Sequence, residues 1–349
     1  MPSDSTLTLF IPDLFGFQST FSKLSRDELT QLPEIRFPNL EKWLSRGTKT
    51  KLTENNDVLF SEFGLSIEKD KPFAALSLLA ENTDLKKSDL YWLRADPVNM
   101  QADRDTVLLA AHEELALSQD EANKLVETIN NHFIDEPWTL YTFGPHRWYL
   151  GLEKSIDLIT HPLNNVLGQN VNHFMSTGED EKYWLAITNE IQMLLHGSIV
   201  NFERDSRNML MANSVWLWGG GYLPDNINIK SNYERIISNN IICSGIGHYC
   251  ELDVLPLDEN FLTHIESGKS FVALDMLSES VQNRDLYTFM QKLNEIETIF
   301  LSQCNELLLD KKIDKLKLIV DSKTIITVTK NQLRHWWKRI KPFTAFKNA

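Results

Sequence analysis

The strongest constraint on the fold is a short apolar run that ends in three consecutive glycines. Residues Ser214 to Trp218 are rich in β-branched and aromatic side chains, and Gly219, Gly220 and Gly221 follow directly. Such a run is typical of a buried strand, and glycine lets another backbone or a ligand approach closely. Two interpretations stay open: a tight turn after a core strand, or a ligand loop beyond the end of a strand in an open α/β sheet.

The rest of the chain alternates between predicted strands and predicted helices. Strands are predicted at 7–11, 91–93, 138–143, 147–152, 214–218, 271–274, 316–320 and 324–329. Helices are predicted at 26–32 after the cap residue Ser25, at 40–46 after the cap residue Asn39, and at 72–79, 119–132, 180–196 and 285–308. This alternation favours an α/β fold with a mixed or parallel sheet.

Composition and charge exclude several classes of protein. The 349 residues carry a net charge of −13, which disfavours nucleic acid and acidic membranes as partners. No run of about 18 apolar residues occurs, so no transmembrane helix is expected, and Met1 to Thr6 lack the basic start of a secretory signal. Cys243, Cys250 and Cys304 have no metal-binding spacing and are interpreted as reduced thiols, which predicts a cytoplasmic protein.

Several segments together resemble one enzyme family, and they occur in the family's order along the chain. The segments are Phe37–Gly47, Trp92–Val98, His146–Leu150, Ile199–Arg204 and, as the best local match, Ala212–Gly219. They resemble the archaeal-type cofactor-independent phosphoglycerate mutases of the alkaline phosphatase superfamily. They also resemble uncharacterised bacterial proteins that carry this label by similarity.

This resemblance implies a fold and a domain arrangement. The expected fold is an alkaline-phosphatase-like three-layer α/β core with a mixed, mostly parallel sheet and a small α+β insert. The core is expected to comprise residues 1–93 and 153–349, and the insert residues 94–152.

The family's chemistry uses a serine nucleophile beside two divalent metals, which activate it and stabilise the charge on the phosphoryl group. The segment that best matches the nucleophile motif is Pro72 to Ser77, and it places Ala74 at the serine position. Ser77 lies one helical turn further on and is a weak substitute. The resemblance therefore implies that the catalytic nucleophile is missing.

The metal ligands that the family would supply are also mostly replaced. The first strand runs into Asp13, which no glycine follows, and the Asp-x-x-x-His pair becomes Asp275 and Glu279. The late Asp-His pair becomes Asp321 and Ser322. Carboxylates alone can bind Mg²⁺ or Mn²⁺, but two metals need several converging ligands. Asp13, Asp275, Glu279 and Asp321 are therefore weak metal candidates, and no cofactor is expected unless Mn or Mg binds there.

Four residues are implied as a substrate site by the resemblance: Arg94, Arg147, Asn201 and Arg204. Arginine suits bidentate recognition of phosphate or carboxylate groups. In an acidic chain, three converging arginines would form a focused anion site. The alternative is that they form salt bridges with neighbours such as Asp96 or Glu203.

The C-terminal segment Arg334 to Arg339 mixes basic and aromatic residues around Trp336 and Trp337. Lysine and arginine stems often cover apolar surface, so this segment is predicted as a terminal helix that packs its tryptophans. An amphipathic contact with a membrane or a partner is the alternative.

Two hypotheses about function follow. The first is a degenerate, non-catalytic relative of phosphoglycerate mutase that binds a phosphorylated or carboxylated metabolite, or a protein partner, in a regulatory role. The second is an active metal-dependent phosphoglycerate mutase or phosphohydrolase with a rearranged site. The simultaneous loss of the nucleophile and of the imidazole ligands favours the first.

Overall fold

The computed structural model divides the chain into two compact units. Unit 1 consists of residues 1–66 and 227–349, and unit 2 of residues 67–226. The structure describes residues 5–21, 23, 36–51, 58–65, 70–84, 89–103, 106–224, 231–265, 268–320 and 324–346. The helix predicted at 26–32 lies outside these residues.

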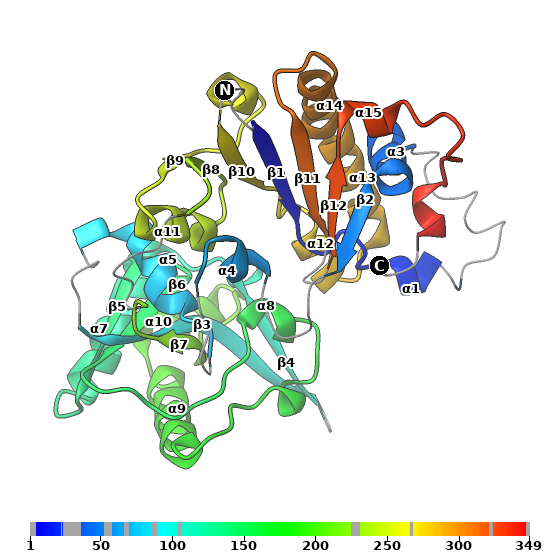
Figure 1. The fold of residues 1–349 in the computed structure, drawn as a ribbon. Helices are drawn as coiled ribbons and strands as arrows, with labels where there is room; N and C mark the ends of the chain where they lie inside the picture. Colours follow the sequence, from blue (N-terminus) through cyan, green and yellow to red (C-terminus); the bar gives the residue numbers. More distant parts are fainter. Residues whose placement is uncertain are drawn as a thin grey trace. The chain divides into compact units, whose positions relative to one another are not determined.

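Unit 1 is built on a seven-stranded sheet with the order β2-β12-β11-β1-β10-β8-β9 (Figure 1). Its strands are β1 (Thr6–Ile11), β2 (Thr48–Lys51), β8 (Arg235–Ile237), β9 (Asp253–Leu255), β10 (Lys269–Ala273), β11 (Lys315–Val320) and β12 (Thr324–Val328). The five strands from β11 to β9 are parallel to one another, whereas β12 and β2 run antiparallel at one edge. The sheet is therefore mixed and mostly parallel.

Helices cover both faces of this sheet. Unit 1 contains α1 (Gln18–Phe21), α3 (Pro38–Arg46), α4 (Val58–Glu62), α11 (Ile241–Tyr249), α12 (Ser278–Gln282), α13 (Leu286–Glu295), the π-helical turn η4 (Ile296–Leu301), α14 (Ser302–Leu309), α15 (Lys330–Leu333), and the short 3₁₀ turns η3 (Phe261–His264) and η5 (Phe343–Ala345). Alternate residues of β1, among them Leu7 and Leu9, point into the main core with α3, α13 and α14. Thr8 on the opposite face contacts Tyr233, and α11 packs against β8 and β9 there. The result is three layers.

Unit 2 is built on a five-stranded antiparallel sheet. Its strands are β3 (Tyr91–Asp103), β4 (Thr106–Ala111), β5 (Trp138–Gly144), β6 (Arg147–Leu152) and β7 (Ser214–Gly221). The long strand β3 pairs with β6 and β4 along one edge and with β7 along the other. Its helices are α5 (Phe73–Glu81), α6 (His112–Leu115), α7 (Gln119–His132), α8 (Leu163–Val166), α9 (Glu181–His196) and α10 (Ile199–Ser206), with the 3₁₀ turn η2 (Val171–His173).

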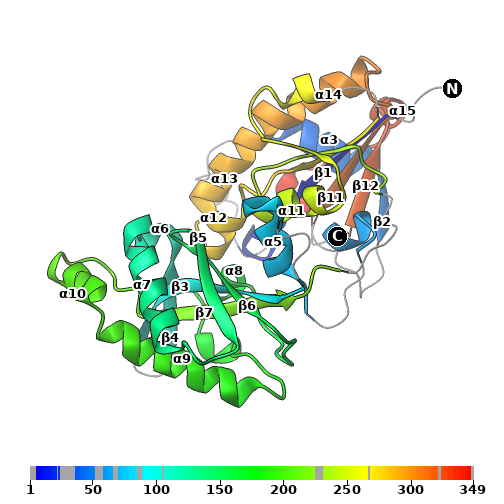
Figure 2. The same cartoon turned by 90° about the vertical axis from the view of Figure 1, so that its left-hand side faces the viewer.

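The two faces of the unit 2 sheet pack against different helices (Figure 2). Leu93, Ala95 and Leu150 point into the larger core, with apolar residues of α7, α9 and α10. Trp92 and Tyr149 alternate with them and pack against Ala74, Ala75 and Leu78 of α5.

The three glycines lie in β7, where α5 approaches the strand closely. A Cβ atom on Gly219 would lie 2.9 Å from the Cβ of Phe73, and one on Gly221 would lie 2.6 Å from the Cβ of Pro72. Gly219 also has a φ of +68°, which a larger residue rarely adopts. The three glycines therefore allow a helix to pack closely on a strand. They form neither a simple turn after the strand nor a phosphate-binding loop.

The division of the chain differs from the expected insert at 94–152. Unit 2 also includes α5, α9, α10 and β7, because β7 pairs with β3 and α9 contributes to the same core. The strand predicted at 91–93 continues to Asp103, and residues 199–206 form a helix.

Two local predictions were wrong. Asn39 is not the N-cap of its helix, which begins at Pro38 and has Phe37 as a cap without a side-chain hydrogen bond. The C-terminal tryptophans do not pack inside a helix: α15 ends at Leu333, and Trp336 and Trp337 are 82% and 64% exposed. None of the described helices has the length and apolar character needed to cross a membrane.

Candidate functional site

The first candidate site lies at the carboxyl edge of the parallel strands of unit 1. Asp13 follows β1 and Asp275 follows β10, and these strands are parallel neighbours whose residues Phe10 and Ala273 are paired. Ligands of open α/β sheets bind beyond the carboxyl ends of such strands. Two of the four metal candidates therefore lie at the edge where a site is expected.

Both carboxylates already have neutral hydrogen-bond donors. Ser278 Oγ donates to Asp13 Oδ2 at 2.6 Å, and Asn240 Nδ2 donates to Asp275 Oδ2 at 2.8 Å. Asn240 also accepts from the amides of Ile242 and Cys243, so it caps α11. Sequence reasoning missed both donors, although Asn240 stands directly before a helix, where cap residues occur.

The other two candidates do not extend this set. Glu279 is exposed, and Asp321 lies outside the described residues. Within the described part of the chain, no three His, Cys, Asp or Glu side chains gather closely enough to hold a metal ion. Two carboxylates do not match the ligand requirement of a two-metal phosphoryl-transfer site.

The nucleophile position implied by the resemblance lies in α5 of unit 2. Ala74 is completely buried, and so is Ser77 one turn later. Ser77 Oγ donates to the carbonyl of Ala74 at 3.2 Å and also forms a hydrogen bond with Tyr149. Neither position presents a hydroxyl to solvent.

Arg94 lies in a buried polar cluster on the same face of the unit 2 sheet. Its Nε donates to Asp96 Oδ1 at 3.0 Å, and its guanidinium stacks on Tyr149 and Trp218 at 4.8 and 5.3 Å from the ring centroids. Trp218 Nε1 donates to the second oxygen of Asp96 at 2.7 Å. Burial raises the pKa of Tyr149 to about 12. Arg94 therefore forms a buried salt bridge with Asp96, as the alternative to an anion site predicted.

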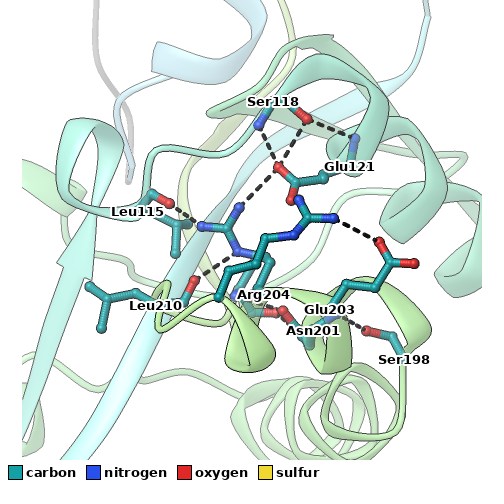
Figure 3. Close-up of polar contacts among 10 residues, drawn as sticks. Leu115, Ser118, Glu121, Ser198, Asn201, Glu203, Arg204 and Leu210 are labelled. Carbon is teal, nitrogen blue, oxygen red and sulfur yellow. Dashed lines mark hydrogen bonds and ion pairs between the residues drawn. The ribbon is translucent and has the colours of Figure 1, made fainter.

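Arg204 and Asn201 lie on the other side of the sheet and hold loops together (Figure 3). Arg204 is fully buried and donates to the carbonyls of Leu115 and Leu210 and to Glu121 Oε2. Glu121 forms the capping box of α7 with Ser118, and Arg204 and the Ser118 donors together lower its pKa against the opposing effect of burial.

Asn201 is fully buried as well. Its Nδ2 donates to the carbonyls of Leu195 and Ala212, each at 2.8 Å, and its Oδ1 accepts from the amide of Ala212 at 3.0 Å. Both polar atoms of the side chain are thereby used to join the end of α9 to the segment before β7.

Arg147 is the one predicted substrate residue with a substantially exposed side chain. It is 43% exposed, and its Nε donates to Glu81 Oε1. It shares a face of the sheet with Arg94, whereas Arg204 and Asn201 lie among helices on the opposite face. The four residues do not converge on one site, so the predicted cluster of arginines does not form.

No family model matches the chain, but individual proteins are similar to it in sequence. The chain is 27% identical over 177 residues to the 2,3-bisphosphoglycerate-independent phosphoglycerate mutase of Methanosarcina acetivorans. This alignment covers 49% of the chain and 44% of the relative. It is 23% identical over 190 residues to a probable enzyme of the same name from Geobacter sulfurreducens, covering 53% and 48%. The alignments thus span less than half the length of these relatives.

One solved structure shares the fold over most of both chains. A protein from Pyrococcus horikoshii superposes with a TM-score of 0.55 at 13% identity, covering 94% of this chain and 88% of that one. The cofactor-independent phosphoglycerate mutase from Thermoplasma acidophilum covers 97% and 93% at 13% identity, with a TM-score of 0.45. The expected fold class, an α/β core with a mixed, mostly parallel sheet, is confirmed. The chain is therefore similar in sequence to the cofactor-independent phosphoglycerate mutases, and its fold is that of a solved structure over nearly its whole length.

Proposed function

We propose that this chain is a degenerate phosphoglycerate-mutase-like protein that acts by binding and does not transfer phosphoryl groups. The observation that carries the proposal is that Ala74, which the resemblance implies at the nucleophile position, is fully buried. Without a nucleophilic atom there, a phosphoryl-enzyme intermediate cannot form at that residue. The buried hydroxyl of Ser77 does not replace it, because it faces Ala74 and Tyr149.

The proposed role is regulatory binding of an anionic metabolite or of a protein partner in the cytoplasm. For the anionic metabolite, a phosphorylated or carboxylated small molecule, Arg147 is the residue best suited to make contact. Its side chain is 43% exposed, and a ligand carboxylate or phosphate could replace Glu81 as its partner. A ligand contact at Arg147 would thus break the Arg147–Glu81 ion pair and leave the fully buried Arg204 contacts intact.

Calorimetric titration with 3-phosphoglycerate tests this role. Arg147→Ala should weaken binding about tenfold, since a charge-assisted hydrogen bond contributes roughly 1.5–3 kcal/mol. Arg207→Ala is the matched control, because Arg207 is also exposed and paired with a glutamate, Glu203. Equal binding by both variants would remove Arg147 from the site. An absence of binding to any phosphorylated or carboxylated compound would leave the protein partner as the proposed ligand.

A second candidate function rests on the position of Asp13 and Asp275. Their carboxylates lie at the ends of adjacent parallel strands, and Ser278 Oγ is 2.6 Å from Asp13. An active phosphoglycerate mutase or phosphohydrolase with a rearranged site could use these carboxylates for Mn²⁺ or Mg²⁺.

Turnover of phosphoglycerates and of a general phosphomonoester with added Mn²⁺ separates the two candidates. The binding proposal predicts no turnover and no tightly bound metal after dialysis. Turnover that is lost on Asp275→Asn, with the variant still folded, would establish the second candidate and overturn the first.

A further inference from the structure

A surface near the C-terminus of unit 1 combines exposed tryptophans with a local excess of positive charge. Residues 330–341 contain five basic and no acidic residues, in a chain whose net charge is −13. Trp336, Trp337 and Ile340 are 82%, 64% and 42% exposed. We call Trp336, Trp337, Lys338, Arg339, Ile340 and Lys341 the tryptophan patch.

The tryptophan patch is anchored at both ends. Leu333 before it and Phe343 after it are 3% and 2% exposed, and Phe343 stacks on Phe15. Between them, the amide of Lys341 donates to Ser45 Oγ at 3.0 Å, and Lys338 Nζ donates to the carbonyl of Arg46 at 3.3 Å. Figure 1 shows this segment, in red, beside α3. The segment that carries the exposed rings is therefore held in place by contacts at both ends and in its middle.

More positive charge comes from the edge strand β2. Lys49 and Lys51 are exposed, and Lys49 lies over the ring of Phe346 at 5.4 Å. Partial burial lowers the pKa of Lys49, and the ammonium groups of Lys341 and Lys51 lower it further. Lys49 and Lys51 thus add positive charge next to Lys341 of the tryptophan patch.

We propose that the tryptophan patch binds the surface of an anionic lipid bilayer. Tryptophan is enriched at the membrane–water interface because its ring is apolar and its N–H is polar. Basic residues next to it add attraction to anionic headgroups. The overall negative charge does not prevent this contact, because charges more than about 8 Å apart are screened at physiological ionic strength. This local effect overrides the expectation, drawn from net charge alone, that the chain avoids acidic membranes.

The ring geometry favours a bilayer over single-stranded nucleic acid. Binding of successive bases uses exposed aromatic faces as stacking platforms. Trp336 and Trp337 instead meet edge to face, with an interplanar angle of 83°, and His335 stacks on Trp337 at 4.5 Å. One face of Trp337 is therefore already covered.

Co-sedimentation of the full-length chain with lipid vesicles tests the proposal. Binding to phosphatidylglycerol–phosphatidylcholine vesicles is expected at physiological ionic strength, with loss at high salt and little binding to phosphatidylcholine alone. Lys338→Gln/Arg339→Gln/Lys341→Gln should lower the partition coefficient roughly 100-fold, from the usual contribution of each basic residue. Trp336→Ala/Trp337→Ala leaves the charge of the protein unchanged but removes two large apolar rings, so it should weaken binding more than tenfold.

Matched controls lie in unit 2. Lys124→Gln/Lys154→Gln/Lys182→Gln removes the same positive charge from exposed positions, and Phe202→Ala removes an aromatic ring that is 74% exposed. Neither control should reduce vesicle binding, and the melting temperatures of all variants should match. Absence of binding to anionic vesicles at physiological ionic strength, or equal losses in patch and control variants, overturns the proposal. Binding of a single-stranded oligonucleotide in place of vesicles overturns it as well.

Discussion

At the scale of single residues, Glu297 shows how a buried charge can be retained for a local purpose. Its side chain lies in the π-helical turn η4, is 3% exposed, and accepts from the amides of Asn39 and Leu40 at 2.7 and 3.1 Å. It also accepts from Asn39 Nδ2 at 2.9 Å. Glu297 thus caps α3 from 258 residues away in the sequence, which replaces the local cap predicted at Asn39.

Glu297→Ala should lower the free energy of unfolding by roughly 1–3 kcal/mol, because it leaves buried amides without acceptors. Burial raises the pKa of this carboxyl, although the hydrogen bonds from Asn39 and Leu40 oppose the shift. The folded state then binds more protons than the unfolded state, so this group's contribution to stability falls as pH rises above the ordinary glutamate pKa.

Urea unfolding of wild type and variant between pH 4 and 7, read from the transition of unit 1, measures this effect. The difference between them should be largest at the acidic end and shrink towards neutrality. Glu306→Ala, at an exposed position of α14, is the control and should change stability little. A difference that grows with pH would contradict the raised pKa.

Gly219 offers a second test at residue scale. Gly219→Ala should destabilise the protein by about 2 kcal/mol or more, because its φ is +68° and the new Cβ would meet Phe73 at 2.9 Å. Gly197→Ala is the control, since its nearest neighbours would lie at 3.7 Å or beyond. Thermal melts of both variants decide the point, and equal melting temperatures would show that α5 can move away from β7.

At the scale of elements, Arg204 connects three parts of unit 2. Its fork of donors reaches Glu121 in α7, the end of α6 at Leu115, and the loop at Leu210. Arg204→Lys keeps the charge but cannot make all three contacts, so it should destabilise by roughly 2–3 kcal/mol. Arg207→Lys should have almost no effect.

Chemical denaturation and anion titration of the Arg204 variants together distinguish a structural from a binding role. The structure predicts a loss of stability with unchanged ligand affinity. An unchanged stability with a lost affinity would return Arg204 to the substrate site that the resemblance implied.

Elements with strong local signals were predictable from sequence. The helix Gln119–His132 with its capping box at Ser118, and the strands Trp138–Gly144 and Arg147–Leu152, lie where the pattern placed them. Other elements were missed or wrong. Ser198 caps the helix Ile199–Ser206, which the sequence pattern did not predict, and the C-terminal tryptophans stay exposed where the basic-aromatic pattern predicted a packed helix.

At the scale of the whole molecule, the fold class could be predicted from the alternation of strands and helices and from the family resemblance. Which of the candidate site residues lie close together could not be predicted. Asp13 and Asp275 lie at the same edge of the sheet because β1 and β10 are neighbours, although about 260 residues separate them. Arg94 lies on the face of β3 that α5 covers, whereas Arg204 belongs to α10, which packs on the opposite face. Strand order and the face on which a side chain lies are tertiary properties, and no single segment encodes them.

The division into units carries the last prediction. Unit 2 is continuous in sequence from Ile67 to Asn226 and has its own apolar core around Leu93, Leu125 and Trp184. A fragment of residues 67–226 should therefore fold alone, with a cooperative melt and a near-ultraviolet dichroism signal from its buried tryptophans. Unit 1 is assembled from two separate segments, so residues 227–349 alone lack β1 and should not fold. A broad, non-cooperative melt of the 67–226 fragment would show that its core depends on the rest of the chain.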